Sequence, residues 1–253
     1  MLSRSRFDLQ TATTPRAAVS RPSGHLSACN ACKVRDIVVC GALDEAELSA
    51  LSAIKSVIEL EPNALLFQDG ESADYLFNVT SGVIRVNKLL ADGRRQITGF
   101  LFPGDFLGIS NNDEYACSAE AVTHTSVCRF HRKKLEALLM RFPKLEHRLL
   151  SIASHELAAA QDQMMLLGRK TARERVASFL IMLSHCATRI GLPASPISLP
   201  MGGSDIGDYL GLSPETVSRT MSCLRGEGII ADARPGSVEL IECKQLEEIS
   251  ASR

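Results

Sequence analysis

The chain has 253 residues, of which 45% are hydrophobic, with a formal net charge of −1 and a pI near 6.6. This length suits one large domain or two of ordinary size, and the hydrophobic content excludes a chain that is disordered throughout. The near-neutral charge excludes a global basic field for nucleic acids, so that any contact with DNA must rest on a local patch.

Residues 1–27 are rich in Arg, Ser, Thr and Ala and lack the apolar core of a secretory signal. We expect them to form a disordered tail. No apolar run in the chain approaches the roughly 18 residues of a membrane span. Eight cysteines in such a chain favour metal or redox chemistry over a disulfide framework. We therefore expect a cytoplasmic protein that does not associate with membranes.

Three of these cysteines, Cys29, Cys32 and Cys40, form a C-x2-C-x7-C pattern. Their chemistry alone leaves zinc, an iron–sulfur cluster and a metal-free redox dithiol open. Either metal group needs a fourth ligand, for which Cys117 and Cys128 are the candidates. The other cysteines stand singly, and we expect them to be small core residues; they are Cys186, Cys223 and Cys243.

The segment after the cysteines begins with a short predicted helix, with Asp44 as its N-cap. From residue 59 to about residue 132, short apolar runs alternate with turn signals. The turns contain glycines at a spacing of 11 or 12 residues, each of which we expect to adopt a positive φ angle; they are Gly70, Gly82, Gly93 and Gly104. This pattern predicts an antiparallel β-sandwich or barrel.

A long helix is predicted next, with Pro143 near its start and two apolar stripes along it. A single domain needs only one such stripe to cover its core. The first stripe comprises Leu138, Phe142, Leu145, Leu149 and Ile152. The second stripe has the alternating spacing of a coiled-coil seam and comprises Leu150, Ala153, Leu157, Ala160, Met164 and Leu167. We expect this second stripe to form the interface of a parallel homodimer, rather than a second buried face in one large core.

The C-terminal region has the pattern of a winged helix-turn-helix. A helix over residues 171–191 is followed by a short helix after Ser204, a turn at Gly211, and a second helix with Ser213 as N-cap and Pro214 at its first position. Two short strands around a Pro-Gly turn then predict the wing.

Glu215, Ser218 and Arg219 share one face near the start of that second helix. A recognition helix presents such positions to base edges, where Arg can bind guanine and Glu can accept from cytosine. An exposed Glu–Arg ion pair is the simpler interpretation of the same residues, but their place after a capped turn favours DNA contact. Between residues 168 and 225 basic residues outnumber acidic ones, which suits contacts with phosphates.

The segments "QITGFLFPGDFLG" and "GDYLGLSPETVSR", with the long helix and the wing, resemble the CRP/FNR family of bacterial transcription regulators over roughly residues 29–245. The resemblance implies an α+β fold: a cupin-like, cyclic-nucleotide-binding-like β-sandwich with its cluster-binding loop over residues 28–135, a dimerisation helix over 136–168, and a winged helix-turn-helix over 169–253. The "ETVSR" segment matches the FNR-type pattern Glu-x-x-Ser-Arg, which implies a homodimer on a palindrome similar to TTGAT-N4-ATCAA.

The same resemblance implies a cofactor. FNR-type regulators hold an oxygen-labile [4Fe-4S] cluster with three N-terminal cysteines and one from the sandwich, which here correspond to Cys29, Cys32, Cys40 and Cys128. The implied function is control of anaerobic or microaerobic genes, with RNA polymerase as a further partner. The alternative is a regulator of the same family that uses its cysteines for zinc binding or thiol redox sensing.

Two other functions are not favoured by the sequence. The stretch "FLGISNNDEYACSAEA" lacks the arginine with which relatives bind a cyclic phosphate, and no convergent acid, base or nucleophile predicts an enzyme. One position departs from oxygen-switched relatives: Ala160 stands where they carry an acidic residue in the seam. We therefore expect dimerisation to depend less on the cluster than in those relatives.

Overall fold

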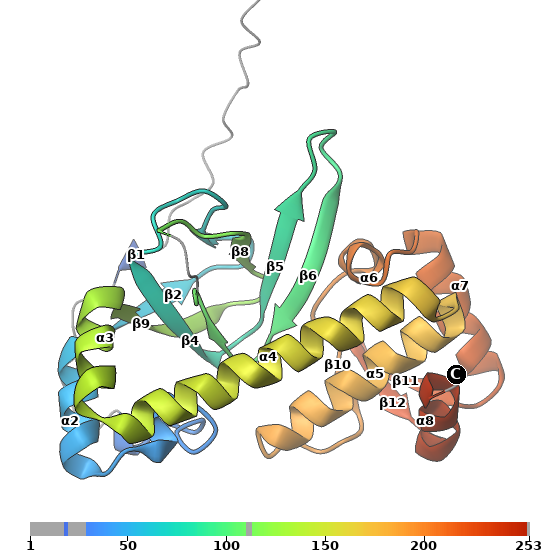
Figure 1. The fold of residues 1–253 in the computed structure, drawn as a ribbon. Helices are drawn as coiled ribbons and strands as arrows, with labels where there is room; N and C mark the ends of the chain where they lie inside the picture. The colour runs from blue at the N-terminus through green and yellow to red at the C-terminus, as the bar shows by residue number, and fades with distance from the viewer. Residues whose placement is uncertain (1–17, 20–28, 110–112, 252–253) are drawn as a thin grey trace, which may run out of the picture.

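The computed structural model describes residues 18–19, 29–109 and 113–251 (Figure 1). The predicted tail lies outside these residues, apart from the two-residue strand β1 (Ala18–Val19), which pairs with Ile58 and Glu59 of β2. None of the helices in the described part of the chain is long and apolar enough to cross a membrane.

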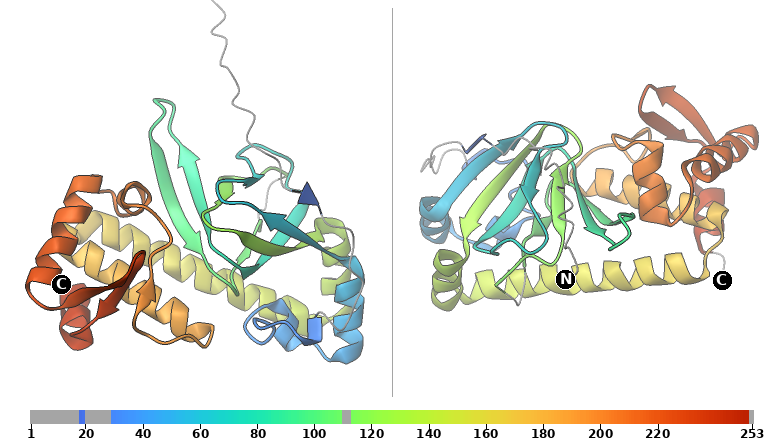
Figure 2. Two further views of the ribbon diagram at one scale, coloured as in Figure 1. Left: turned by 180° about the vertical axis from the view of Figure 1, so that it is seen from behind. Right: turned by 90° about the horizontal axis from the view of Figure 1, so that it is seen from above.

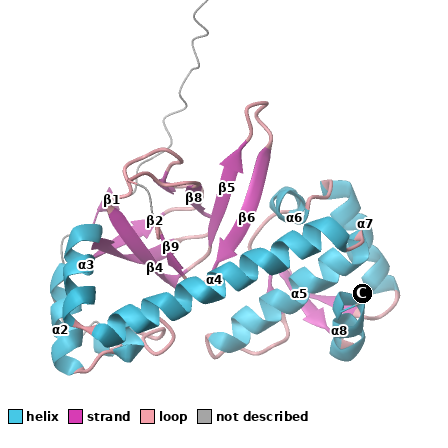
Figure 3. Cartoon of the chain, viewed as in Figure 1, coloured by secondary structure: helices cyan, strands magenta, loops and turns pink. Residues whose placement is uncertain are grey.

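The N-terminal half contains a β-sandwich, as predicted (Figures 1 and 3). One sheet has the order β1-β2-β9-β4-β7 and the other the order β3-β8-β5-β6. The remaining strands are β2 (Lys55–Leu60), β3 (Leu65–Phe67), β4 (Tyr75–Ser81), β5 (Ile84–Leu89), β6 (Arg95–Leu101), β7 (Phe106–Leu107), β8 (Ser118–Ala121) and β9 (Thr125–His131). Alternate side chains of the two sheets form the core between them, among them Val79 and Val127 of the first sheet and Ile84 and Ala119 of the second.

The turns of the sandwich confirm the positive φ angles predicted for the four glycines, which lie between 81° and 102°. Gly82 shows why glycine is needed. A β-carbon at this position would lie 2.4 Å from the carbonyl oxygen of His124, so that a larger residue would clash with backbone as well as strain the turn.

The outer face of the first sheet is covered by α2 (Glu45–Ile54), α3 (Arg132–Arg141) and the first turns of α4 (Pro143–Arg169). Asp44 is the N-cap of α2, as predicted: its Oδ1 accepts from the Glu47 amide at 2.9 Å, and the Glu47 carboxylate accepts from the Asp44 amide. The 3₁₀ helix η1 (Val39–Ala42) lies just before this cap.

The region predicted as one long helix is divided in two. Helix α3 ends at Arg141, Phe142 adopts φ −124° and ψ 87°, and α4 begins at Pro143. The proline disfavours helical geometry in the residue before it and suits the first position of a new helix, so it separates two helices instead of lying within one. Helix α4 then runs along the whole molecule, from the sandwich to the C-terminal half (Figure 2).

The C-terminal half is the predicted winged helix-turn-helix. It consists of α5 (Ala172–Arg189), α6 (Gly203–Leu210), α7 (Pro214–Gly226), a three-stranded sheet of β10 (Ile197–Ser198), β12 (Ser237–Leu240) and β11 (Ile230–Arg234), and a final helix, α8 (Cys243–Ala251). Helix α8, which we did not predict, packs on α5. The observed architecture confirms the α+β fold class.

Candidate cysteine site and DNA-binding surface

Cys128 lies in the middle of β9, between β2 and β4, on the outer face of the first sheet. It pairs in register with Val57 on one side and with Asn78 on the other. Residues directly opposite one another in a sheet point to the same face, so the Asn78 side chain lies beside Cys128. Cys128 packs with Leu76 and Phe130 in a core that is separate from the interior of the sandwich.

The N-terminal cysteines reach this face through the loop of residues 29–43. Cys29 is buried, Cys40 lies in η1, and both belong to the same hydrophobic cluster as Cys128. Cys32 is half-buried, and its amide donates to the Cys29 carbonyl at 3.3 Å. The fold therefore brings the two distant parts of the predicted ligand set to one place.

The pKa values of the thiols also reflect their convergence. Burial raises the pKa of Cys40 to about 12, and repulsion from Cys128, Cys29 and Cys32 contributes in the same direction. Burial likewise raises the pKa of Cys128 to about 12; the positive charge of Lys55 opposes this shift, and repulsion from Cys32, Cys29 and Glu59 adds to it. Cys40 and Cys128 thus each interact electrostatically with Cys29 and Cys32.

Lys55, at the start of β2, adds a positive charge to the site. Its side chain is buried, with 6% of the residue exposed, and Nζ donates to Sγ of Cys29 at 3.0 Å. Burial alone would lower the pKa of Lys55, but the hydrogen bond to Cys29 and the charges of Cys128, Cys29 and Cys40 raise it above its ordinary value. The lysine therefore carries its charge at neutral pH.

A single arginine connects the cysteine loop to the long helix. Arg148 of α4 donates from Nη2 to the carbonyl oxygen of Ile37 at 2.7 Å and from Nε to that of Val38 at 3.4 Å. Ile37 also fills the space beside Gly104, where a β-carbon would lie 2.5 Å from its Cδ1. The loop is thus held between the sandwich and α4.

The donor set fits a thiolate-bound cofactor. All eight cysteines are free thiols, and the four at this site share it with a buried cation that would balance negative charge on their sulfurs. Asn78 is 3% exposed, and its Oδ1 has no hydrogen-bond partner, which leaves an unsatisfied amide beside Cys128. Within residues 18–19, 29–109 and 113–251 no three His, Cys, Asp or Glu side chains are close enough to hold one metal ion directly.

The other cysteines lie elsewhere. Cys117, which we did not choose as a ligand, packs against the interior of the sandwich. Cys186 is half-buried in α5, with Sγ 3.7 Å from the sulfur of Met182. Our prediction that Cys223 and Cys243 are core residues is wrong, because both are exposed; the apolar faces of their helices are formed by neighbours such as Leu224 and Leu246.

A pocket of about 370 Å³ lies between the sandwich and α4, and it does not suit a cyclic nucleotide. Its walls include Val86, Leu101, Tyr115 and Cys117, and its one charged residue is Glu156. Burial raises the pKa of the Glu156 carboxyl, and the negative charge of Asp105 adds to this effect. Since none of the described residues around the pocket is basic, nothing there pairs with a phosphate.

The predicted recognition residues occupy one exposed face of α7. Ser213 caps the helix, with Oγ accepting from the Thr216 amide at 3.2 Å, and Pro214 is its first residue. Glu215, Ser218 and Arg219 are exposed, while the opposite face of α7 is buried through Val217, Met221 and Leu224. Hydrogen bonds from its own backbone amide and from Ser213 lower the pKa of Glu215, as does the charge of Arg219.

The turn before α7 depends on two glycines. Gly211 ends α6 with φ 63° and ψ 41°, the left-handed conformation that favours glycine. Gly207 lies so close to the turn that a β-carbon there would be 2.6 Å from the carbonyl oxygen of Leu212. These contacts fix the angle between α6 and α7, and hence the direction in which the recognition face points.

Most of the basic surplus predicted for this region binds partners within the chain. Arg173 pairs with Glu227, Arg189 with Asp105 and Arg225 with Asp232. Arg175 donates to the backbone carbonyls of Leu167, Lys170 and Leu210. The surplus therefore contributes less to phosphate binding than the sequence suggested.

Helix α4 has two different apolar faces. The stripe predicted to cover the core of the chain is buried or half-buried there, as at Leu145, Leu149 and Ile152. In the predicted seam, Leu150, Leu157 and Met164 are 62–65% exposed in the single chain, and Ala160 is exposed as well. Ala153 and Leu167, the other two seam residues, are half-buried.

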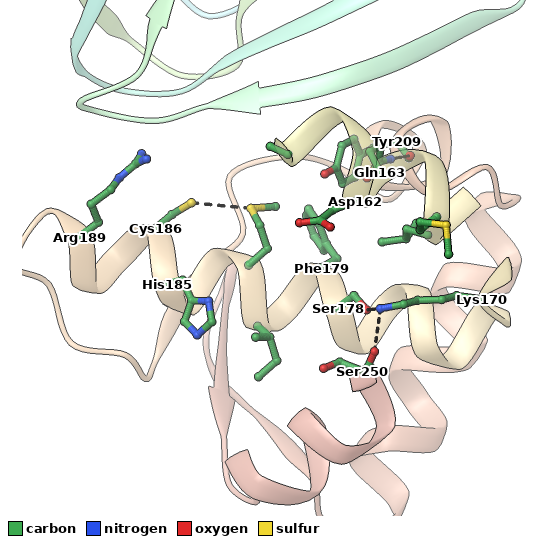
Figure 4. A pocket seen from close by; sticks show the side chains of 15 residues that line it. Asp162, Gln163, Lys170, Ser178, Phe179, His185, Cys186, Arg189, Tyr209 and Ser250 are labelled. Atoms are coloured by element: carbon green, nitrogen blue, oxygen red, sulfur yellow. Dashed lines mark hydrogen bonds between the residues drawn. The ribbon is translucent and has the colours of Figure 1, made fainter. Parts of the chain in front are cut away.

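A second pocket, of about 610 Å³, lies between α4 and α5 (Figure 4). Lys170 reaches across it and donates to Ser178 Oγ at 2.8 Å and to the carbonyl oxygen of Ser250 in α8 at 2.7 Å. This lysine connects the end of α4 to α5 and to the C-terminal helix.

The hairpin of β5 and β6 contacts the helix-turn-helix through an ion-pair network that the sequence did not reveal. Asp205 of α6 accepts from Arg85 at 3.0 Å and from Arg95 at 2.5 Å, and Arg95 also binds Asp208 at 2.7 Å. Next to this network, Phe100 packs against Phe179 and Tyr209, with ring centroids 6.1 and 5.3 Å apart. The two halves of the chain therefore share one continuous core.

Comparison with known proteins supports this architecture. Residues 57–142 match the cyclic nucleotide-binding domain family, and residues 174–249 match the Crp-like helix-turn-helix domain family. The transcriptional activatory protein AadR of Rhodopseudomonas palustris is 38% identical over 221 residues, which cover 87% of this chain and 92% of that protein. The chain belongs to the CRP/FNR family of transcription regulators.

Two further comparisons support the assignment of the chain to the CRP/FNR family. The nitrogen fixation regulation protein FixK of Bradyrhizobium diazoefficiens is 36% identical over 94% of this chain and 99% of its own length. The structure of FixK2 from Bradyrhizobium japonicum matches with a TM-score of 0.74 and 36% identity, covering 79% of this chain and 99% of that one. Helix α7, which carries the predicted recognition residues, lies within the region that matches the Crp-like helix-turn-helix domain.

Proposed function

We propose that this protein is an oxygen-responsive, DNA-binding transcriptional activator of the FNR type, whose Cys29, Cys32, Cys40 and Cys128 hold a [4Fe-4S] cluster. The observation that carries the proposal is the convergence of the N-terminal cysteine loop on Cys128 in β9, far from it in sequence, around a buried lysine. Such a cluster supplies a connection between the loop and the sheet that oxygen can break.

The residues of the chain explain how this site would act on DNA binding. Gathered thiolates hold residues 29–43 against β9, and Arg148 transfers the position of that loop to α4 through two backbone carbonyls. Leu150, which begins the seam, is only two residues further along the same helix. An ordered loop therefore favours one position of the seam, and a loosened one releases it, which shifts the population of DNA-binding dimers.

The proposed dimer forms through the seam of α4. Three large apolar side chains, Leu150, Leu157 and Met164, are exposed at coiled-coil spacing and would be buried against the same residues of a second chain. Pairing there places two copies of α7 for successive major-groove sites of a palindrome similar to TTGAT-N4-ATCAA. Arg219 would bind guanine, Glu215 would accept from cytosine, and Ser218 would allow close approach.

Activation requires contact with RNA polymerase, which we propose as a further partner. The relatives support this role, since AadR is named a transcriptional activatory protein. A reporter fused to a promoter with the palindrome should respond only when the recognition face of α7 is intact.

The alternative is a regulator of the same family that senses through zinc or through thiol oxidation. A single zinc ion bound at about 2.3 Å to each thiolate would bring the four sulfurs within about 4 Å of one another. Among the residues described here, no such compact set is present. The same four thiols are nevertheless ligands that zinc accepts, and we therefore keep zinc as the second candidate.

One experiment separates these candidates. Protein purified without oxygen should contain iron and sulfide and show a broad absorption band near roughly 400 nm that bleaches in air, with a parallel loss of binding to the palindrome. Zinc without such a band would support the alternative. Colourless, metal-free protein that binds the palindrome equally well before and after air would overturn cluster sensing and leave only the DNA-binding function.

A further inference from the structure

The charge environment of Lys55 is unusual for a buried lysine. The side chain begins β2 opposite Phe130 of β9, and it lies on the face that carries Cys128. Among the residues that the structure describes, its ammonium donates one hydrogen bond, to Sγ of Cys29. Cys29, the acceptor of this hydrogen bond, packs in the same cluster as Cys40 and Cys128.

A buried ammonium needs negative charge nearby, because burial removes its hydration and a neutral thiol replaces little of it. Cys29, Cys40 and Cys128 belong to one cluster beside Lys55 and would provide this charge as thiolates. At the same time, four thiolates gathered at one site repel one another. The negative charge of a thiolate-bound cluster would therefore stabilise the buried ammonium of Lys55. The ammonium would in turn reduce the repulsion among the thiolates.

Strand β4, on the other side of Cys128, also carries a buried polar side chain on this face, here a neutral one. Asn78 of β4 lies opposite Cys128, is almost fully buried, and has an unsatisfied Oδ1 as well as a long 3.4 Å contact from Nδ2 to the Val79 carbonyl. The strands on both sides of Cys128 thus each place a buried polar group on its face: Lys55 with a thiol as its acceptor, and Asn78 with an unsatisfied Oδ1. This is independent support for an additional group at the site.

We propose that Lys55 is the counter-charge of the thiolate-held cluster: a positioning residue that binds Cys29, slows loss of the cluster and raises its reduction potential. This inference rests on the proposed function. A fixed positive charge near the cluster favours the electron-richer state, so its removal makes reduction more difficult.

The test compares Lys55→Met, which keeps the length and apolar stem of the side chain, with Lys55→Arg, which keeps the charge. Lys33→Met is the matched control, because Lys33 is exposed and lies in the same loop next to Cys32. Each variant is purified without oxygen as the full chain. We measure the midpoint potential of the cluster, its half-life with an iron chelator, and the Tm of the cluster-free protein.

We expect Lys55→Met to shift the midpoint potential to more negative values and to shorten the cluster half-life by about tenfold or more. Lys55→Arg should keep the midpoint potential and the cluster half-life close to those of the unsubstituted protein. Lys33→Met should change neither quantity. In the cluster-free protein, Lys55→Met should leave the Tm unchanged or raise it, because an apolar side chain then replaces a poorly compensated charge.

Two outcomes would overturn the inference. If Lys55→Met lowers the Tm of cluster-free protein and leaves the potential and half-life of the cluster unchanged, then Lys55 is a structural residue and the proposed function still stands. If the unsubstituted protein takes up no iron and sulfide, then both the proposed function and the role of Lys55 fail.

Discussion

Two buried charged regions of this molecule differ in how completely the protein satisfies them. Where the sandwich meets the helix-turn-helix, Arg85 and Arg95 face Asp205 and Asp208, and each guanidinium has a carboxylate within 3.0 Å. At the cysteine site, the ammonium of Lys55 donates to a thiol, Sγ of Cys29. The charges of the first region are balanced within one chain, whereas under the proposed function those of the second would be balanced by thiolates that hold the cluster.

This difference helps to separate structural from functional residues. A matched ion-pair network holds two elements in one orientation, and its removal should act on stability. An unmatched charge beside four free thiols should act on what the site binds. The apolar groups of α4 show the same difference. One apolar face of this helix is buried within the chain, whereas the other, the predicted seam, is largely exposed.

The largest expected effect follows from removing a thiol at the unmatched site. Cys128→Ser should abolish the incorporation of iron and sulfide, because a hydroxyl is a poor ligand in place of a thiolate. Chemical analysis of protein purified without oxygen measures this loss. Cys117→Ser is the control and should retain the cluster, since Cys117 packs inside the sandwich. Equal loss in both variants would argue against the assignment of Cys128.

A charge in the exposed seam should prevent dimer formation. Leu157→Glu places a carboxylate at a position that is 62% exposed in one chain and that would face its own copy in a dimer. We expect a monomer by analytical ultracentrifugation at micromolar concentration, with an unchanged circular dichroism spectrum. Met140→Glu is the control, because Met140 is exposed on α3, outside the seam. A stable Leu157→Glu dimer would place the interface elsewhere.

Breaking the matched network should destabilise the fold. Asp205→Asn removes the charge that both Arg85 and Arg95 share, and the side chain is only 12% exposed. We expect a loss of about 1–3 kcal/mol in the free energy of unfolding, measured with urea, because each arginine loses one charged partner, while Arg85 keeps Glu120 and Arg95 keeps Asp208. Asp208→Asn should cost less, since its side chain is 31% exposed and it binds Arg95 alone. The reverse order would contradict a central role for Asp205.

The smallest effect is expected at a surface pair. Arg173 and Glu227 are each 41% exposed, so Glu227→Gln should change stability little, and added salt should remove the difference. The hydrogen bond from Arg173 lowers the pKa of Glu227. Any stabilisation is therefore fully present above the ordinary pKa of the carboxyl and is lost as the pH falls through its lowered value in the folded state. Thermal unfolding across this pH range measures it.

Local sequence signals predicted much of the fold. Asp44 and Ser213 were identified as N-caps, and the positive φ angles of the turn glycines were predicted, because each depends on neighbours within a few residues. The division between α3 and α4 was missed, although Pro143 was noted, because apolar periodicity continues through the break.

Long-range contacts could not be predicted in the same way. Arg85 and Asp205 are 120 residues apart, and no pattern in the sequence relates them. For the same reason Lys55 was missed: nothing around it in the sequence distinguishes it from a surface lysine, and its role depends on the loop that covers it. The convergence on Cys128 was expected only from the family resemblance.

The contact made by Arg148 has a consequence for how this regulator can change over time. Its acceptors are main-chain oxygens of residues 37 and 38, which every amino acid supplies. Mutations can therefore replace those two side chains and leave the contact between the cysteine segment and α4 in place. Under the proposed function, natural variants can in this way differ in their sensitivity to oxygen while they keep the same connection to α4.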